Sequence, residues 1–173
     1  MQYAEEYNII VPEQHGFRRG RSCGMQLPGP TDELTQDLRS GKQVDLVVMN
    51  FSKAFDKVNH SLLLHKLTHY GITGRVDAFV KSFLTDRQHD AVVDGCRLSY
   101  VPVESGVPQG SVLDLALFHL YINDLFQQTD SNSRLFADNT ICQRLISTEE
   151  DKAILRMILT HELSSWKNAK FSA

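Results

Sequence analysis

Residues 112–126 constrain the fold more than any other part of the sequence. Their apolar side chains go most of the way round a helical wheel, so a helix here has no broad face to offer to water. The wider apolar stretch, 107–126, is too polar to cross a bilayer, because it is interrupted by Gln109, Asp114, His119 and Asn123. We therefore predict a central, buried helix that packs against a sheet.

Amphipathic helices are predicted on both sides of this segment. Apolar residues recur there at helical spacing, and residues that favour helix ends flank them. These helices cover residues 31–41, 61–70 and 75–84, together with a last helix that Thr148 caps and that Glu149, Glu150 and Asp151 begin.

Short runs of β-type residues supply the predicted strands. Residues 44–49 form an apolar run typical of a buried strand. Two residue pairs with strong turn propensity, Asp94-Gly95 and Asp138-Asn139, predict tight hairpins. Residues 11–30 are rich in Gly, Pro and Arg and predict a loop. The order of elements favours an α+β fold, an antiparallel sheet with helices on one face.

Length, charge and cysteine content limit the class of protein and the cellular compartment. A length of 173 residues suits one domain, and a net charge of −3 gives no general attraction for nucleic acid, although a local groove can still be basic. Three cysteines, without a C-x-x-C pair, indicate reduced thiols rather than a disulfide framework. We expect an intracellular protein, cytoplasmic or nuclear, with no membrane partner.

Three segments next to the predicted elements carry the functional signal. They read VVMNFSKAFDKVNH at 47–60, SGVPQGSV at 105–112 and RLFADNT at 134–140. In this order and spacing they resemble the reverse transcriptase palm of a non-LTR (LINE-like) retrotransposon. The resemblance covers nearly the whole chain, from Gln14 to Trp166. In that family the first segment normally reads DFSKAFD and the last FADD.

The resemblance implies that Asn50, Asp138 and Asn139 stand at the three catalytic, metal-binding aspartate positions, of which only Asp138 keeps its carboxylate. The family's chemistry uses two divalent cations about 3.5–4 Å apart, and Mg²⁺ prefers carboxylate oxygens. Opposite charges near 4 Å are worth about 4 kcal/mol at an effective dielectric near 20. We therefore expect weakened Mg²⁺ binding at Asp138 and a rate lower by several orders of magnitude, with Asn50 the greater loss.

Four further positions match residues that meet the nucleotide in this family, namely Phe51, Phe55, Gln109 and Gly110. Phe55 matches the ring that excludes a 2′-hydroxyl and so selects deoxynucleotides. Gln109 and Gly110 match the turn that contacts nucleotide and template ahead of a helix N-terminus. The alternatives are a plain core phenylalanine and a turn that only caps a helix.

The loop sequence QHGFRRGRSC at 14–23 resembles the family's fingers motif near template and nucleotide. Its arginines Arg18, Arg19 and Arg21 are nucleic-acid-binding candidates that would meet phosphates, or else they form an ordinary solvated surface. The implied partners are an RNA template, a DNA primer and a deoxynucleoside triphosphate. Where the family usually reads LGP after PQGSV, Asp114 places a charge at the start of the apolar helix, which is tolerable if it faces solvent.

As a whole, the resemblance implies a single partial reverse transcriptase domain over residues 1–173. We expect fingers-like parts at 1–43 and 59–104 and a ferredoxin-like palm at 44–58 and 105–173, without the thumb or the family's first arginine-bearing strand. Two functions remain open. The chain is either an RNA-directed DNA polymerase domain by descent, catalytically impaired in this copy, or a non-catalytic folded remnant that at most binds nucleic acid.

Overall fold

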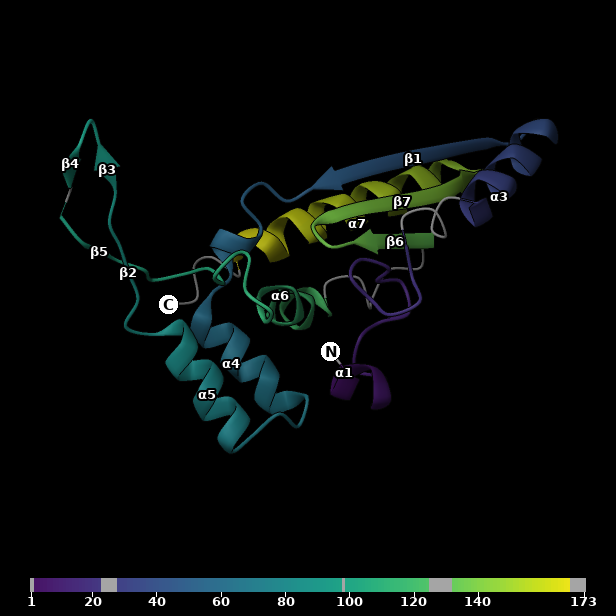
Figure 1. Cartoon of the computed structure of the whole chain (residues 1–173). Helices are drawn as coiled ribbons and strands as arrows, with labels where there is room; N and C mark the ends of the chain where they lie inside the picture. Colours follow the sequence, from purple (N-terminus) through teal and green to yellow (C-terminus); the bar gives the residue numbers. More distant parts are fainter. Residues whose placement is uncertain (1, 23–27, 98, 125–131, 169–173) are drawn as a thin grey trace. The chain divides into compact units, whose positions relative to one another are not determined.

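The computed structural model describes residues 2–22, 28–97, 99–124 and 132–168 (Figure 1). These residues combine α-helices with antiparallel strands, which confirms the predicted α+β class. They form two compact units, one made of Met1–Ser52 and Ile122–Asn168 and the other of Lys53–Tyr121. In the part of the chain that is described, no helix has the length and apolar character needed to cross a membrane.

The first unit is built on a three-stranded antiparallel sheet. Its strands are β1 (Gln43–Asn50), β6 (Asn132–Phe136) and β7 (Asn139–Ile146), in the spatial order β1-β7-β6 (Figure 1). The register runs from Gln43 opposite Ile146 to Asn50 opposite Asn139. A two-residue loop joins β6 to β7, so the free end of β1 lies beside this loop.

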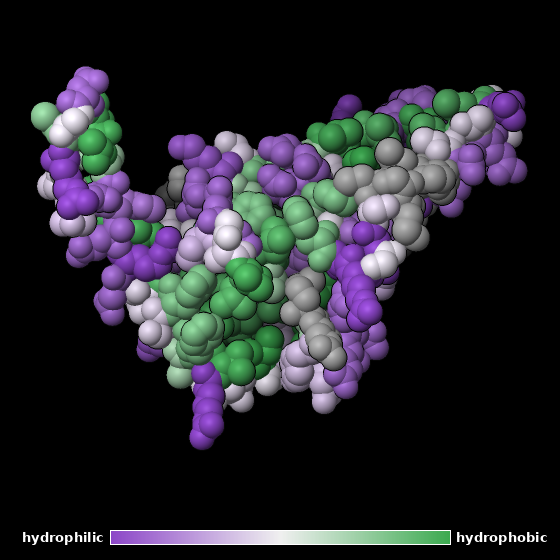
Figure 2. Space-filling model, in the orientation of Figure 1, coloured by the Kyte–Doolittle hydropathy of each residue, from purple (hydrophilic) through white to green (hydrophobic). Residues whose placement is uncertain are grey.

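One face of the sheet is covered and the other is open at β1. On β7, Thr140, Cys142 and Ile146 are buried, and helix α7 (Glu149–Asn168) packs against this strand. Leu46 and Val48 of β1 are exposed, so the strand predicted at 44–49 is present but its predicted burial was wrong, because β1 lies at the edge of the sheet. Apolar residues are visible along this strand in Figure 2. Because side chains alternate between the faces of a strand, the period-two pattern at each strand decides which residues enter the core.

Two helices complete the described part of this unit. Helix α3 (Pro28–Arg39) contacts β1, and the short α1 (Gln2–Glu6) lies near the start of the chain. Thr31 was predicted to cap a helix over 31–41, and this was wrong by three residues at the start. Pro28 opens the helix instead, a position where proline costs no hydrogen bond and its fixed backbone angle is favourable.

The second unit contains a pair of helices and two short ribbons. Helices α4 (His60–His69) and α5 (Arg75–Leu84) pack together and bury Leu63, Leu67, Val80 and Leu84. They match the predicted ranges within one residue. Asn59 starts α4, since its side-chain oxygen accepts a hydrogen bond from the Leu62 amide at 2.9 Å.

The ribbon predicted at Asp94-Gly95 is present but short. It pairs β3 (Val92–Val93) with β4 (Cys96–Arg97), and both turn residues have positive φ angles. A second pairing, β2 (Gln88–His89) with β5 (Val101–Pro102), extends the ribbon toward the rest of the unit (Figure 1). Residue 98 lies outside the described residues.

Helix α6 (Asp114–Ile122) confirms the burial predicted for the apolar segment. Every residue from Ala116 to Ile122 is buried, so all sides of this helix are covered. The helix begins two residues later than predicted, and residues 125–126 of the predicted range lie outside the described residues. Its packing against the sheet stays a prediction.

The prediction for the β6–β7 turn was wrong by one residue. The loop consists of Ala137 and Asp138, whereas Asn139 is already the first residue of β7. Asn139 is held in the ladder because it pairs with Asn50 on one side and Phe136 on the other. As a result Ala137, with φ of 54°, takes the left-handed backbone conformation that the turn requires.

Candidate functional site

Asn50 and Asn139 meet side by side where β1 ends and β7 begins. They are cross-strand partners, so their side chains leave the same face of the sheet. The Nδ2 atom of Asn50 donates a hydrogen bond to Oδ1 of Asn139 at 2.9 Å, in an exposed setting. Residues 89 positions apart in sequence thus share one polar tip.

Asp138 belongs to the same tip. It is the second residue of the β6–β7 loop, and its main-chain oxygen accepts a hydrogen bond from the Phe51 amide at 3.2 Å. Phe51 itself is buried, with 4% of its surface exposed. The main chain of Asp138 therefore lies beside the Asn50–Asn139 pair, where the end of one strand meets the turn of a neighbouring hairpin. That the Asp138 carboxylate faces the same site stays a prediction.

The chemistry of this tip fits a divalent cation poorly. It offers one carboxylate, from Asp138, and two neutral amides that already bond to each other. The Nδ2 group of Asn50 is a donor, which a cation repels. Among the described residues no group of three or more His, Cys, Asp or Glu side chains is placed to hold a metal ion.

Two of the three candidate arginines turn toward the main chain of their own loop. Arg18 donates from Nη1 to the oxygens of Val11 (3.0 Å) and Gln14 (3.4 Å), and its Nε lies 3.6 Å from Glu5. Arg21 donates to the oxygens of Pro12 and Gln14. Arg19 is exposed.

The same loop is electropositive. Burial, and then the positive charges of Arg21, Arg134 and Arg18, hold the pKa of His15 below its usual range. The arginines therefore have a structural role in the loop, and their contact with phosphate stays a prediction.

Gln14 is a residue of this site that the sequence analysis missed. Its side chain is 2% exposed and accepts a hydrogen bond from the main-chain amide of Ala137, the first residue of the Asp138 turn. The resemblance of residues 14–23 to the family's fingers motif is the one sequence signal that points to this segment. A glutamine inside a loop rich in Gly and Arg carries no local signal of burial.

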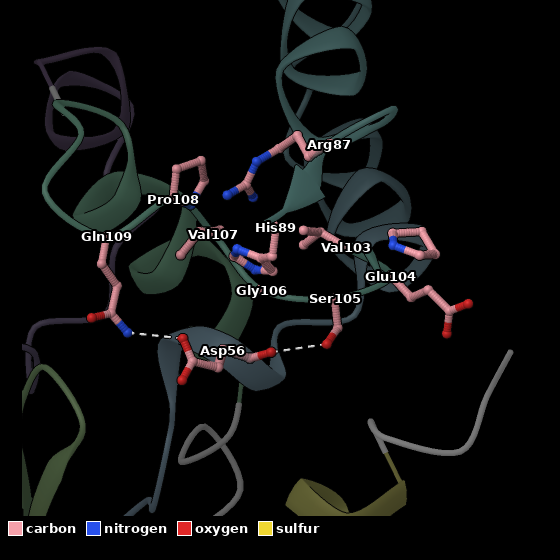
Figure 3. A pocket seen from close by; sticks show the side chains of 11 residues that line it. Asp56, Arg87, His89, Val103, Glu104, Ser105, Gly106, Val107, Pro108 and Gln109 are labelled. Carbon is pink, nitrogen blue, oxygen red and sulfur yellow. Dashed lines mark hydrogen bonds between the residues drawn. The ribbon is translucent and has the colours of Figure 1, made fainter. Parts of the chain in front are cut away.

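In the second unit, residues of two sequence motifs bond directly. Asp56 Oδ1 accepts a hydrogen bond from Gln109 Nε2 at 2.9 Å, and the Asp56 main-chain oxygen accepts one from Ser105 Oγ at 2.9 Å (Figure 3). Gly106 has φ of 88°, and a Cβ there would lie 2.9 Å from the Asp56 Cα. Glycine is therefore required for this approach.

These residues line a pocket of about 370 Å³. Arg87, His89 and Glu104 come from the ribbon side, while Asp56 and Gln109 close the other side (Figure 3). The lining thus mixes both signs of charge with apolar residues such as Val103 and Pro108.

Phe55 and Gly110 are each engaged within the protein. The Phe55 ring stacks on the buried Phe118 ring, with centroids 4.3 Å apart, and Phe55 is partly exposed. The Gly110 amide donates to Asp114 Oδ2 at 2.7 Å. Asp114 is 5% exposed, so its charge does not face solvent, which was the condition under which we considered it tolerable; the amides of Gly110 and Leu115 donate to its carboxylate instead.

Comparison with known proteins gives a consistent family. The model of the family described as "Reverse transcriptase (RNA-dependent DNA polymerase)" matches residues 1–171. The chain is 31% identical, over 126 residues, to the RNA-directed DNA polymerase from mobile element jockey of Drosophila funebris. The aligned region covers 72% of this chain and 14% of the relative.

Two further relatives come from other mobile elements. A probable RNA-directed DNA polymerase from transposon BS of Drosophila melanogaster is 33% identical over 129 residues, 69% of this chain and 13% of the relative. A Pol polyprotein from retrotransposable element R2 of Popillia japonica is 32% identical over 85 residues, 49% of this chain and 14% of the relative. The chain therefore spans only a small part of each.

A solved structure has the same fold. Telomerase from Candida albicans, in complex with the TWJ fragment of telomeric RNA, matches with a TM-score of 0.63 and 13% identity. The match covers 90% of this chain and 30% of the telomerase chain. At this identity the likeness concerns the fold alone.

Proposed function

Because the chain belongs to the reverse transcriptase (RNA-dependent DNA polymerase) family, we propose that it is the palm and part of the fingers of a LINE-like element's RNA-directed DNA polymerase, in a copy with a degenerate catalytic site. One observation carries the proposal. Asn50 and Asn139 pair at one strand tip next to Asp138, and the two amides bond to each other; by the motif resemblance these three residues would stand at the family's metal-binding positions.

The palm assignment has support from topology. The order β1-β7-β6, with α7 against β7, agrees with a ferredoxin-like palm over 44–58 and 105–173. The fingers-like parts would be 1–43 and 59–104. The compact units divide at Ser52 and Tyr121 instead, so these domain limits belong to the proposal alone.

Mg²⁺ is the cofactor that the family implies. When bound, it would supply charge stabilisation to the transferred phosphoryl group. In this chain Asp138 is the one carboxylate at the tip, and removal of two negative charges weakens attraction for a cation. We propose that this copy binds Mg²⁺ weakly and incorporates nucleotides several orders of magnitude more slowly than a chain with three aspartates.

The remaining site residues would bind substrate and nucleic acid. Phe55 would lie against the sugar of a deoxynucleoside triphosphate, and Phe51, Gln109 and Gly110 match further positions at which the family meets the nucleotide. Arg19, exposed in a positively charged loop, would contact the phosphates of an RNA template or DNA primer, with Arg18 and Arg21 shaping that loop. A nucleotide that binds the Gly110 amide would compete with Asp114, because the Asp114 carboxylate already accepts a hydrogen bond from that amide.

A second function is a folded remnant that at most binds nucleic acid. The Asn50–Asn139 bond favours it, since this pair completes its own hydrogen bond without a cation. The family membership is the same for both functions. They differ in whether restored carboxylates restore activity.

Primer extension separates the two. Deoxynucleotide incorporation on a primed RNA template, with Mg²⁺ or Mn²⁺, is compared for the unmodified chain and the Asn50→Asp/Asn139→Asp variant. We expect activity only in the double variant, and adding Asp138→Asn to it should abolish that activity. Equal activity in the unmodified chain and the double variant contradicts the impairment. A silent double variant that still binds a primed template at low salt supports the remnant.

A further inference from the structure

The turn that carries Asp138 is held in an unfavourable backbone conformation. Ala137 has φ of 54° and is 4% exposed. For an L-residue other than glycine, this left-handed region costs about 1–2 kcal/mol. A loop of two residues with such a cost needs support from its surroundings to keep one geometry.

Gln14 gives that support from a distant part of the sequence. Its Oε1 accepts hydrogen bonds from the main-chain amides of Ala137 (3.1 Å) and Gly16 (2.9 Å). A carbonyl oxygen has two lone pairs, so both are used. The Gln14 side chain is 2% exposed, which keeps water from replacing it at the Ala137 amide.

The main chain around Gln14 is fixed to β6. The His15 amide donates to the Leu135 oxygen at 2.8 Å, and the Leu135 amide donates to the Glu13 oxygen at 2.9 Å. Gln14 and Leu135 thus form a parallel bridge that adds an edge to the sheet beside the turn. Arg18 and Arg21 also donate hydrogen bonds to the main-chain oxygen of Gln14, which further fixes this segment.

Gly16 brings the segment close to the turn. A Cβ at Gly16 would lie 2.5 Å from the Ala137 nitrogen, closer than any real contact. The Gln14 oxygen therefore reaches the turn amide only because residue 16 has no side chain.

We propose that Gln14 is a positioning residue for the Ala137–Asp138 turn. By holding the Ala137 amide, it fixes the Phe136–Ala137 peptide at the entry of the turn and so the direction in which Asp138 and Asn139 leave the sheet. Its importance for catalysis rests on the proposed function, whereas its hold on the turn does not. The competing explanation is that Gln14 only fills space in the core.

Amide hydrogen exchange measured by NMR tests this hold. Gln14→Met keeps similar volume without an acceptor, and Gln14→Glu keeps an acceptor oxygen. We expect Gln14→Met to lower the protection of the Ala137 amide about tenfold or more, and Gln14→Glu to retain it. The Leu135 amide, whose acceptor is the Glu13 main chain, is the internal control and should change little. Equal loss at both amides, or no loss at Ala137, overturns the proposal.

A second readout uses the Asn50→Asp/Asn139→Asp background. There, Gln14→Met should lower kcat with little change in KM for the deoxynucleotide, and Gln14→Glu should restore kcat. A higher KM with unchanged kcat, or no rescue of kcat by Gln14→Glu, would contradict the positioning role. If this background has no activity, the proposed function fails while the exchange experiment still decides the role of Gln14.

Discussion

Asn50 donates its side-chain amide to the side-chain oxygen of Asn139 across the last pair of the β1–β7 ladder, at 2.9 Å. Two carboxylates at the same positions have no proton to share at neutral pH, and they repel each other unless a cation lies between them. The two amides therefore make the strand tip independent of metal.

The first prediction concerns this pair. In the absence of divalent cations, Asn50→Asp/Asn139→Asp should lower the free energy of unfolding by about 1–2 kcal/mol, through one lost hydrogen bond and like-charge repulsion. Mn²⁺ should restore most of this loss, since it screens the new carboxylates. Urea unfolding with EDTA and with Mn²⁺ measures both effects.

The single variants serve as its controls. Asn139→Asp keeps an acceptor for the Asn50 amide, and Asn50→Asp keeps an acceptor if the Asn139 amide turns round. Each single variant should therefore change the free energy of unfolding very little, and the loss in the double variant should exceed the sum of the two single losses. Additive effects, or no response to Mn²⁺, would show that the two positions do not share a site.

Substitution of Gly16 should disturb the turn that carries Asp138. Gly16→Ala places a Cβ 2.5 Å from the Ala137 nitrogen, so the loop and the hairpin must separate. We expect a loss of about 1–3 kcal/mol in urea unfolding. Gly20→Ala is the matched control, because a Cβ there meets nothing within 4 Å and bears only the cost of a φ of +72°. A smaller effect at Gly16 than at Gly20 would contradict the close approach.

Asp114 should stabilise the start of α6. Its Oδ2 accepts from the Gly110 amide at 2.7 Å, and its own amide donates to Ser111 Oγ at 3.0 Å. Asp114→Ala should cost about 1–2 kcal/mol in thermal or urea unfolding, and Asp114→Asn less, because one carbonyl oxygen remains. Unchanged stability in Asp114→Ala would mean that the carboxylate does not act as a cap.

The start of α7 should give the chain a measurable acid dependence. Hydrogen bonds from the Ser147 amide, then from Thr148 and Arg144, lower the pKa of Asp151 to about 2 from 3.8. Because the folded pKa is the lower one, the carboxylate stabilises the fold above pH 3.8, and this stabilisation is lost as the pH falls toward about 2.

Asp151→Asn should therefore be less stable than the unmodified chain at pH 7, and the two should converge between pH 3.8 and about 2. Urea unfolding at a series of pH values measures the convergence. Glu150→Gln, exposed in the same helical turn, is the control and should show a smaller difference at pH 7. A gap between Asp151→Asn and the unmodified chain that stays constant with pH would contradict the assignment.

Phe55 offers a test of its two possible roles. In the Asn50→Asp/Asn139→Asp background, Phe55→Val should raise incorporation of ribonucleotides relative to deoxynucleotides if the ring lies against the sugar. If Phe55 only stacks on Phe118, the substitution should lower stability and leave the ratio unchanged. Competition between the two nucleotides in primer extension gives the ratio directly.

Features that depend on neighbouring residues could be predicted from the amino-acid sequence. Thr148 accepts from the Asp151 amide at 3.3 Å and caps α7 as predicted, because both partners lie within one turn. The burial of α6 and the Asp94-Gly95 ribbon were likewise readable, since apolar periodicity and turn propensity are local properties.

The details of the site depend instead on contacts between residues far apart in the sequence. The turn moved to Ala137–Asp138 because Asn139 pairs with Asn50, 89 residues away, and the energy of that ladder outweighs local turn propensity. Gln14 likewise reaches Ala137 across 123 residues. Such contacts form between groups that a linear pattern does not relate, so their partners are fixed only when the chain has folded.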